Sequence, residues 1–143
     1  AEVTLRLDLG ADGAEVRINQ TELQQVLVNL ITNAVQAMPE GGYLEIATDR
    51  SREDGSDSVS IAVADNGIGI SAELQTQVFD PFFSTKRGEG SGLGLSICRD
   101  LIRRAHGTIT VESEPGKGAR FTIILPTVNS GPGEGQEGAA VPV

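Results

Sequence analysis

The sequence predicts an α+β fold, a two-layer α/β sandwich in which a mixed sheet of about five strands carries three helices on one face. Segments that alternate apolar and polar residues, as half-buried strands do, are interspersed with segments of helical periodicity. The two kinds do not alternate strictly along the chain, which disfavours a doubly wound parallel sheet. The length of 143 residues suits one domain with a buried core.

The first expected elements are a strand, a short extended segment and the longest helix. Residues 3–9 alternate apolar and polar side chains, and residues 15–18 are extended, so the two segments are expected to pair as a hairpin. Asn19 precedes Glu22 by three positions, which is a capping-box arrangement. Apolar residues then repeat at helical spacing as far as Met38, so a helix is expected there.

The middle of the chain is expected to contain two strands and a short helix. Residues 43–48 and 59–64 alternate as strands do, on either side of a polar loop over residues 49–58. A short helix is expected over residues 71–79, because the following Pro81 ends it.

The rest of the chain begins with a loop that is long by ordinary standards. Residues 80–92 have no periodic pattern, so we expect this loop to have a function. A helix over residues 93–106 and two strands over 108–112 and 120–125 follow. The glycine-rich residues 129–143 have no apolar periodicity and are expected to form a flexible tail.

The composition disfavours several classes of function. The chain has 20 acidic and 11 basic residues and a net charge of −9, which argues against an electrostatic nucleic-acid binder. No apolar run approaches the ~18 residues that cross a bilayer, and the start lacks the pattern of a signal peptide. The single cysteine, Cys98, excludes an internal disulfide and a multi-cysteine metal site. The expected location is therefore the cytoplasm.

Two asparagines stand out on the longest expected helix. Asn29 and Asn33 lie four residues apart, so they share a face of the helix that flanks the apolar stripe. Ordinary surface asparagines would explain the pair, although asparagine is a mediocre helix former. Their carbonyl oxygens would suit a hard cation such as Mg²⁺, which favours oxygen ligands.

A carboxylate and two glycines follow the strand expected over residues 59–64. The pattern Gly67-x-Gly69-x-x-Ala72 matches the dinucleotide-binding fingerprint. That fingerprint requires a second strand ending in an acid about 20 residues later, where this chain has a loop. What remains is Asp65 at a strand end, beside glycines that let a ligand approach the backbone closely.

A second glycine cluster, Gly88-Glu-Gly-Ser-Gly-Leu-Gly94, leads directly into a helix. Such a segment presents free N–H groups and the positive end of the helix dipole, an arrangement that binds phosphate. It is not a Walker loop, because no Lys-Ser or Lys-Thr follows the last glycine. Lys86 lies just upstream and could reach an anion. A flexible surface loop is the alternative interpretation.

Taken together, these motifs resemble a known family. Their order and spacing are similar to the N, G1, F and G2 boxes of the ATP-binding catalytic domain of bacterial sensor histidine kinases, within the gyrase, heat-shock chaperone and mismatch-repair ATPase superfamily. The resemblance covers residues 3–126, and the residues within the motifs are most similar to those of the nitrogen- and dicarboxylate-sensing branch. The matching segments are Asn29-x-x-x-Asn33, Asp65-x-Gly67-x-Gly69, Phe79-Asp80-Pro81-Phe82-Phe83 and Gly90-x-Gly92-x-Gly94.

The resemblance implies an ATP-binding catalytic domain over residues 1–128, with a mobile lid over residues 70–92. By analogy Asn33 ligates Mg²⁺, and Asp65 accepts a hydrogen bond from the adenine amino group. Asn29 and Lys86 are the expected catalytic residues, and both would contact the nucleotide. The other expected nucleotide contacts are Gly67, Gly69, Ile70, Phe79, Gly90, Ser91, Gly92, Leu93, Gly94 and Leu95.

The implied activity is that of a protein histidine kinase in two-component signalling. Asn29 stands where the superfamily's ATP hydrolases have a catalytic Glu, and an amide cannot act as a general base, so transfer to a histidine is expected rather than hydrolysis. The acceptor would lie on a helical dimerisation domain of the same parent, with a response regulator downstream. Anchoring of that parent in the inner membrane stays open at this point. His106, at the end of a helix, is not expected to be the acceptor.

Two other functions stay open at this point. One is a serine/threonine kinase of the anti-sigma-factor kind, and the other is a regulatory module that binds the nucleotide without transferring phosphate. The chain also departs from the family pattern at Thr108, where a second Gly is frequent, and at Ala119, where Ser or Thr is usual. The missing hydroxyl at position 119 leaves a polar contact to the adenine region in question.

Overall fold

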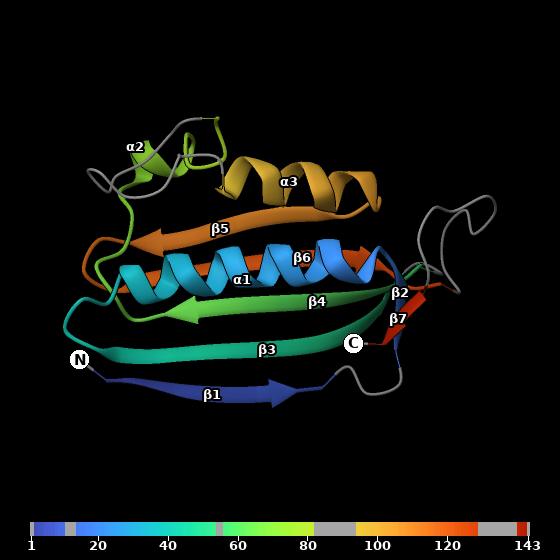
Figure 1. The fold of residues 1–143 in the computed structure, drawn as a ribbon, viewed down its shortest axis with the longest axis horizontal. Coiled ribbons are helices and arrows are strands. Elements are labelled where there is room, and N and C mark those ends of the chain that lie inside the picture. The colour runs from blue at the N-terminus through green and yellow to red at the C-terminus, as the bar shows by residue number, and fades with distance from the viewer. Residues whose placement is uncertain (1, 11–13, 54–55, 82–93, 129–139, 143) are drawn as a thin grey trace.

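The computed structural model describes residues 2–10, 14–53, 56–81, 94–128 and 140–142. Its centre is a mixed five-stranded sheet of strand order β1-β3-β4-β6-β5, with helices on one face, and this confirms the predicted fold class (Figure 1). The strands of this sheet are β1 (Val3–Leu9), β3 (Gly42–Glu53), β4 (Ser56–Asp65), β5 (Thr108–Glu114) and β6 (Gly118–Pro126).

The two main helices lie side by side over the sheet (Figure 1). Helix α1 (Gln20–Gln36) packs on β4, and helix α3 (Gly94–Arg104) packs on β5. The short helix α2 (Ala72–Gln75) also contacts β5. Residues 82–92 of the expected lid lie outside the described residues, so only its first part, residues 70–81, belongs to this description.

Strand register aligns the apolar side chains into rows that form the core. β1 is parallel to β3, and the other neighbouring strands are antiparallel. One such row contains Ile61, Ile123 and Ile109, which lie opposite one another on β4, β6 and β5 and are all buried. Leu30 of α1 and Ile102 of α3 are fully buried in the same core. Each such side chain contributes about 1.5–3 kcal/mol to folding.

Helix α1 begins where the sequence predicts. The Asn19 side chain accepts hydrogen bonds from the backbone N–H groups of Thr21 at 2.8 Å and Glu22 at 3.2 Å, which satisfies two free donors of the first turn. Helix α3 is followed by His106 in the left-handed region, with φ 65°. Gly107 N–H then donates to the Ile102 carbonyl at 2.9 Å, so the chain turns away from the helix.

The expected hairpin of residues 3–9 and 15–18 is wrong. β2 (Glu15–Arg17) pairs instead with β7 (Ala140–Pro142) in a separate two-stranded antiparallel sheet. The apolar residues of β1 gain a matching partner in β3, where Leu5 lies opposite Leu44. The segment expected to be a flexible tail, residues 129–143, therefore contains a paired strand.

Two further elements differ in length from expectation. The segment expected to be a polar loop, residues 49–58, belongs mostly to β3 and β4, whose pairing continues to Glu53 and Ser56. The helix expected over residues 71–79 is only α2, followed by turns. Polar side chains misled the first prediction, because this hairpin pairs charges across its strands instead of burying apolar groups.

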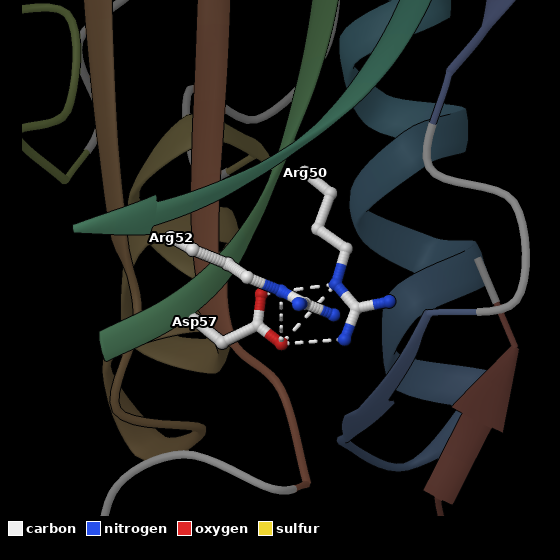
Figure 2. Close-up of polar contacts among 3 residues, drawn as sticks. All are labelled: Arg50, Arg52 and Asp57. Carbon is white, nitrogen blue, oxygen red and sulfur yellow. Dashed lines mark hydrogen bonds and ion pairs between the residues drawn. The ribbon is translucent and has the colours of Figure 1, made fainter. Parts of the chain in front are cut away.

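That charge pairing centres on Asp57, which two arginines approach (Figure 2). The Arg50 Nη2 lies 2.5 Å from Asp57 Oδ2, and Arg50 Nε donates to Oδ1 at 3.0 Å, so the contact is bidentate. Arg52 Nε is 3.7 Å from Oδ2. The hydrogen bond from Arg50 holds the pKa of Asp57 below its ordinary value, against a smaller opposing effect of burial. The same hydrogen bond raises the pKa of Arg50.

We expect Asp57→Asn to lower the melting temperature at pH 7 by about 2–5 °C. A carboxyl whose pKa is lowered by folding adds stability above its unfolded pKa of about 3.9, and this is lost as the pH falls through the folded value. The difference between variant and wild type should therefore shrink below about pH 4. Thermal melts from pH 2 to 7, with the exposed Asp49→Asn as control, test this. A constant difference across that range would contradict it.

Candidate functional site

The loop after β4 is held on both sides by backbone hydrogen bonds. Ile68 N–H donates to the Ala37 carbonyl at the end of α1, at 3.0 Å. On the other side, Gly116 N–H donates to the Ile68 carbonyl at 2.7 Å. Ile70 N–H donates to Ser113 Oγ at 2.7 Å. This loop is therefore a fixed connection between α1 and the β5–β6 hairpin.

Asp65, the last residue of β4, is oriented by two backbone donors. Its Oδ1 accepts from Gly67 N–H at 2.9 Å and from Ala119 N–H at 3.3 Å. Position 119, which lacks the usual hydroxyl, thus contacts the site through its backbone. A carboxylate only accepts hydrogen bonds when ionised, so an oriented Asp65 is chemically suited to a donor such as an amino group.

The two glycines of this loop are required by the surrounding backbone. A Cβ on Gly67 would lie 2.2 Å from the Ala37 carbonyl oxygen. Gly69 has φ +73°, and a Cβ there would lie 2.1 Å from the Glu114 carbonyl oxygen. The structure therefore supplies a packing reason for both glycines, while their expected contact with a nucleotide stays a prediction.

Asn29 connects α1 to the start of α3. Its Nδ2 donates to the Gly94 carbonyl at 3.4 Å and to Cys98 Sγ at 3.7 Å. Because a carbonyl oxygen only accepts, the amide nitrogen of Asn29 is the atom that faces Gly94. Asn33, one turn further along α1, is half-buried, and its backbone carbonyl accepts from Ala37 N–H at 3.1 Å.

Cys98, whose Sγ accepts the second hydrogen bond of Asn29, is fully buried. Burial raises the pKa of this thiol to about 11, although the hydrogen bond from Asn29 opposes the shift. Its Sγ donates to the Val26 carbonyl at 3.7 Å. The thiol is therefore protonated at neutral pH and packs between the two helices, as expected for a structural cysteine.

Phe79 contacts a residue of β6 and a residue of α3. Its ring meets the ring of the buried Phe121 edge to face, with centroids 6.0 Å apart and an interplanar angle of 89°. The Arg99 guanidinium carbon is 5.9 Å from the Phe79 ring centroid. Two other expected contacts, Ile70 and Leu95, are partly buried against the core.

The structure brings some of the expected site residues together. Asn29 contacts Gly94, and the end of the helix that carries Asn33 is hydrogen-bonded to the loop of Gly67. The expected residues that lie outside the described part of the chain are Lys86, Gly90, Ser91, Gly92 and Leu93.

Sequence reasoning did not identify three residues that shape this site. Ser113 Oγ accepts from Ile70 N–H and donates to the Gly118 carbonyl at 2.6 Å, and Gln75 Nε2 donates to the Ile70 carbonyl at 2.9 Å. The third is Arg99. A polar residue on a strand, a helix or a turn is common, so no sequence signal marks these three.

A helix-covered mixed sheet, with an oriented carboxylate and glycines at a strand end, is the arrangement that the sequence motifs imply. Residues 18–129 match the model of the family described as "Histidine kinase-, DNA gyrase B-, and HSP90-like ATPase". The chain belongs to this family, which confirms the resemblance of its sequence motifs.

Similar proteins are sensor histidine kinases. The chain is 39% identical to the alginate biosynthesis sensor protein KinB of Pseudomonas aeruginosa, over 87% of this chain and 20% of that protein. It is 43% identical to the sensor histidine kinase ZraS of Klebsiella oxytoca, over 78% of this chain and 23% of that protein. The chain thus spans about a fifth to a quarter of the length of these curated relatives.

Solved structures give the same result. The catalytic domain of the histidine kinase ThkA has a TM-score of 0.75 and 30% identity, over 87% of this chain and 78% of that one. Full-length ShkA, crystallised in complex with AMPPNP, has a TM-score of 0.74 and 28% identity, over 99% of this chain and 27% of that one. Among the described residues of our chain, no helix is both long and apolar enough to cross a membrane.

Proposed function

We propose that this chain is the catalytic domain of a sensor histidine kinase, which binds Mg-ATP and transfers the γ-phosphoryl group to a histidine on a separate helical domain of its parent. The observation that carries the proposal is the contact of Asn29 with Gly94 at 3.4 Å. It places an amide, which cannot take a proton from water, beside the start of α3, where phosphate is expected to bind.

Asp65 supports the adenine end of this proposal. Its Oδ1 is fixed by Gly67 and Ala119, so its carboxylate would accept a hydrogen bond from the adenine amino group at little orientational cost. The bound AMPPNP of the similar protein ShkA is an ATP analogue, which suggests the same ligand class for this chain. ATP supplies the phosphoryl group, and the protein positions it and excludes water.

The donor set fits magnesium held together with a nucleotide. Among the described residues, no group of three or more His, Cys, Asp and Glu could hold a metal ion. Mg²⁺ usually keeps several waters and is bound through one or two protein oxygens and the phosphates of a substrate. Asn33, with one amide oxygen on the flank of α1, would supply such a ligand. Lys86 would contact the phosphates.

The proposed partners follow from the same assignment. The acceptor helix would belong to the parent's dimerisation domain, and a response regulator would receive the phosphoryl group next. We propose that the domain works in the cytoplasm. The expected likeness to the nitrogen- and dicarboxylate-sensing branch stays a prediction.

Incubation with γ-labelled ATP and Mg²⁺ tests the proposal. We expect the chain alone to bind ATP but to acquire no label, because its acceptor lies elsewhere. Addition of the parent's helical dimerisation domain should produce acid-labile label on the helices, slowly, because the lost tether lowers the effective concentration of the acceptor. The exposed Gln25→Ala on α1 is a control for Asn29→Ala, which should reduce the transfer.

Each other outcome contradicts the proposal in a different way. Acid-stable label would indicate a serine/threonine kinase. Saturable ATP binding without transfer to any helical partner would indicate a regulatory module. Label on His106 would make that residue the acceptor. Equal ATP affinity with Mg²⁺ and in EDTA would remove the role proposed for Asn33.

A further inference from the structure

The ring of Phe79 contacts two side chains, one aromatic and one cationic. Phe121, on β6, meets its ring edge to face, and the Arg99 guanidinium lies over the ring at 5.9 Å. We propose that Arg99 is a positioning residue of the nucleotide site, which acts by holding Phe79 against Phe121. This inference rests on the proposed function, because it concerns binding of ATP at that site.

Among the residues that the structure describes, Phe79 is the partner that the Arg99 guanidinium contacts. Its Nε is buried and has no hydrogen-bond partner among the residues that the structure describes. A buried donor without a partner is costly, so something must favour this placement of the side chain. A cation within about 6 Å of an aromatic centroid is attracted by the ring, and more strongly where water is excluded.

The position of Phe79 explains why its placement matters. The residue before it, Val78, is buried, and Phe79 itself is one of the expected nucleotide contacts. Its ring is fixed by β6, a central strand, and by α3. A ring held by two rigid elements is positioned more accurately than one held only by its own turn.

Helix α3 also begins at the end of the site where phosphate is expected to bind. Gly94, at its start, accepts the hydrogen bond from Asn29, and Arg99 follows five residues later. Arg99 therefore fixes Phe79 relative to the same helix that places the expected phosphate contact. Loss of Arg99 would leave Phe79 less well aligned with the start of α3, without removing any group that is expected to contact phosphate.

Arg99→Met is the direct test, because methionine keeps the length and removes the charge. We expect the Kd for ATP to rise about tenfold, the size expected for one partly buried cation–π contact. Arg103→Met, on an exposed position of the same helix, carries the same charge change and should leave the Kd within about twofold. Arg99→Lys, which also places a cation near the ring, should restore most of the affinity.

A double-mutant cycle separates positioning from direct contact. In a Phe79→Leu background, Arg99→Met should have no further effect on the Kd, because the ring through which it acts is gone. Adenosine and ATP should lose affinity by the same factor. An equal effect of Arg99→Met in both backgrounds, or a loss confined to ATP, would mean that Arg99 binds phosphate directly, and the proposal would be wrong.

Fluorine NMR gives a readout that does not depend on nucleotide binding. The chain has four phenylalanines, so 4-fluorophenylalanine labelling should give four signals, and Phe79→Leu identifies one of them. Arg99→Met should shift the signals of Phe79 and Phe121, whereas Arg103→Met should not. Unshifted signals would overturn the ring contact. Failure of the wild type to bind ATP, with the signals shifted as expected, would overturn the proposed function instead.

Discussion

Asp65→Asn should weaken ATP binding about 10- to 150-fold, while the melting temperature stays within about 2 °C of the wild type. The lost interaction is a hydrogen bond to a charged acceptor, worth about 1.5–3 kcal/mol. Oδ1 accepts the hydrogen bonds from Gly67 and Ala119, and asparagine keeps one oxygen that can accept them. What changes is the second oxygen, which becomes an NH₂ group that cannot accept from adenine.

Calorimetric titration with ATP and GTP measures this effect. The variant should also lose its preference for ATP, because the guanine carbonyl can accept from the new NH₂ group. Asp8→Asn, an exposed aspartate on β1, is the control for the change in charge. Unchanged affinity and selectivity would show that Asp65 does not recognise adenine.

Gly69→Ala should lower the free energy of unfolding by about 2–5 kcal/mol. A non-glycine residue in the left-handed region costs about 1–2 kcal/mol, and forced overpacking adds about 1–3 kcal/mol. The new Cβ would lie 2.1 Å from the Glu114 carbonyl oxygen. Because the position of a Cβ is fixed by its own backbone and the oxygen belongs to the backbone of Glu114, neither atom can move aside by a simple rotation, and the loop after β4 must shift.

Gly116→Ala is the matched control for this prediction. Gly116 has φ +80°, close to that of Gly69, but a Cβ there would meet nothing within 4 Å. Its replacement should therefore show the backbone strain alone, about 1–2 kcal/mol. Urea unfolding of both variants separates the two effects. Equal losses of stability would mean that the contact with Glu114 relaxes freely.

The sequence predicted elements well where one face is apolar and the ends are marked. Helix α1 has four buried residues at regular spacing and an Asn19 cap, and it begins at the predicted place. The strands of the main sheet were also found, because alternation marks a half-buried strand. Pairing was harder to predict. β2 has three residues, and its partner β7 lies at the far end of the chain.

The candidate site was predictable where chemistry and spacing coincide. Asn29 and Gly94 are 65 positions apart, and only the resemblance to a family suggested that they share a site before the structure brought them into contact. Ala119 was considered in the sequence only for the hydroxyl that it lacks, and Arg99 was not predicted as a site residue at all. One acts through a backbone N–H, which every residue but proline has, and the other acts through a ring 20 positions away.

The hydrogen bond from Ala119 to Asp65 has a consequence for folding. It joins two antiparallel hairpins, β3–β4 and β5–β6, each of which pairs residues that are close in sequence. Local hairpins form quickly, whereas the pairing of β4 with β6 must close a long loop. The carboxylate therefore acquires its second donor only when the two halves of the sheet meet. The adenine end of the site should be among the last parts to form and the first to open. A bound nucleotide would therefore stabilise the association of the two hairpins.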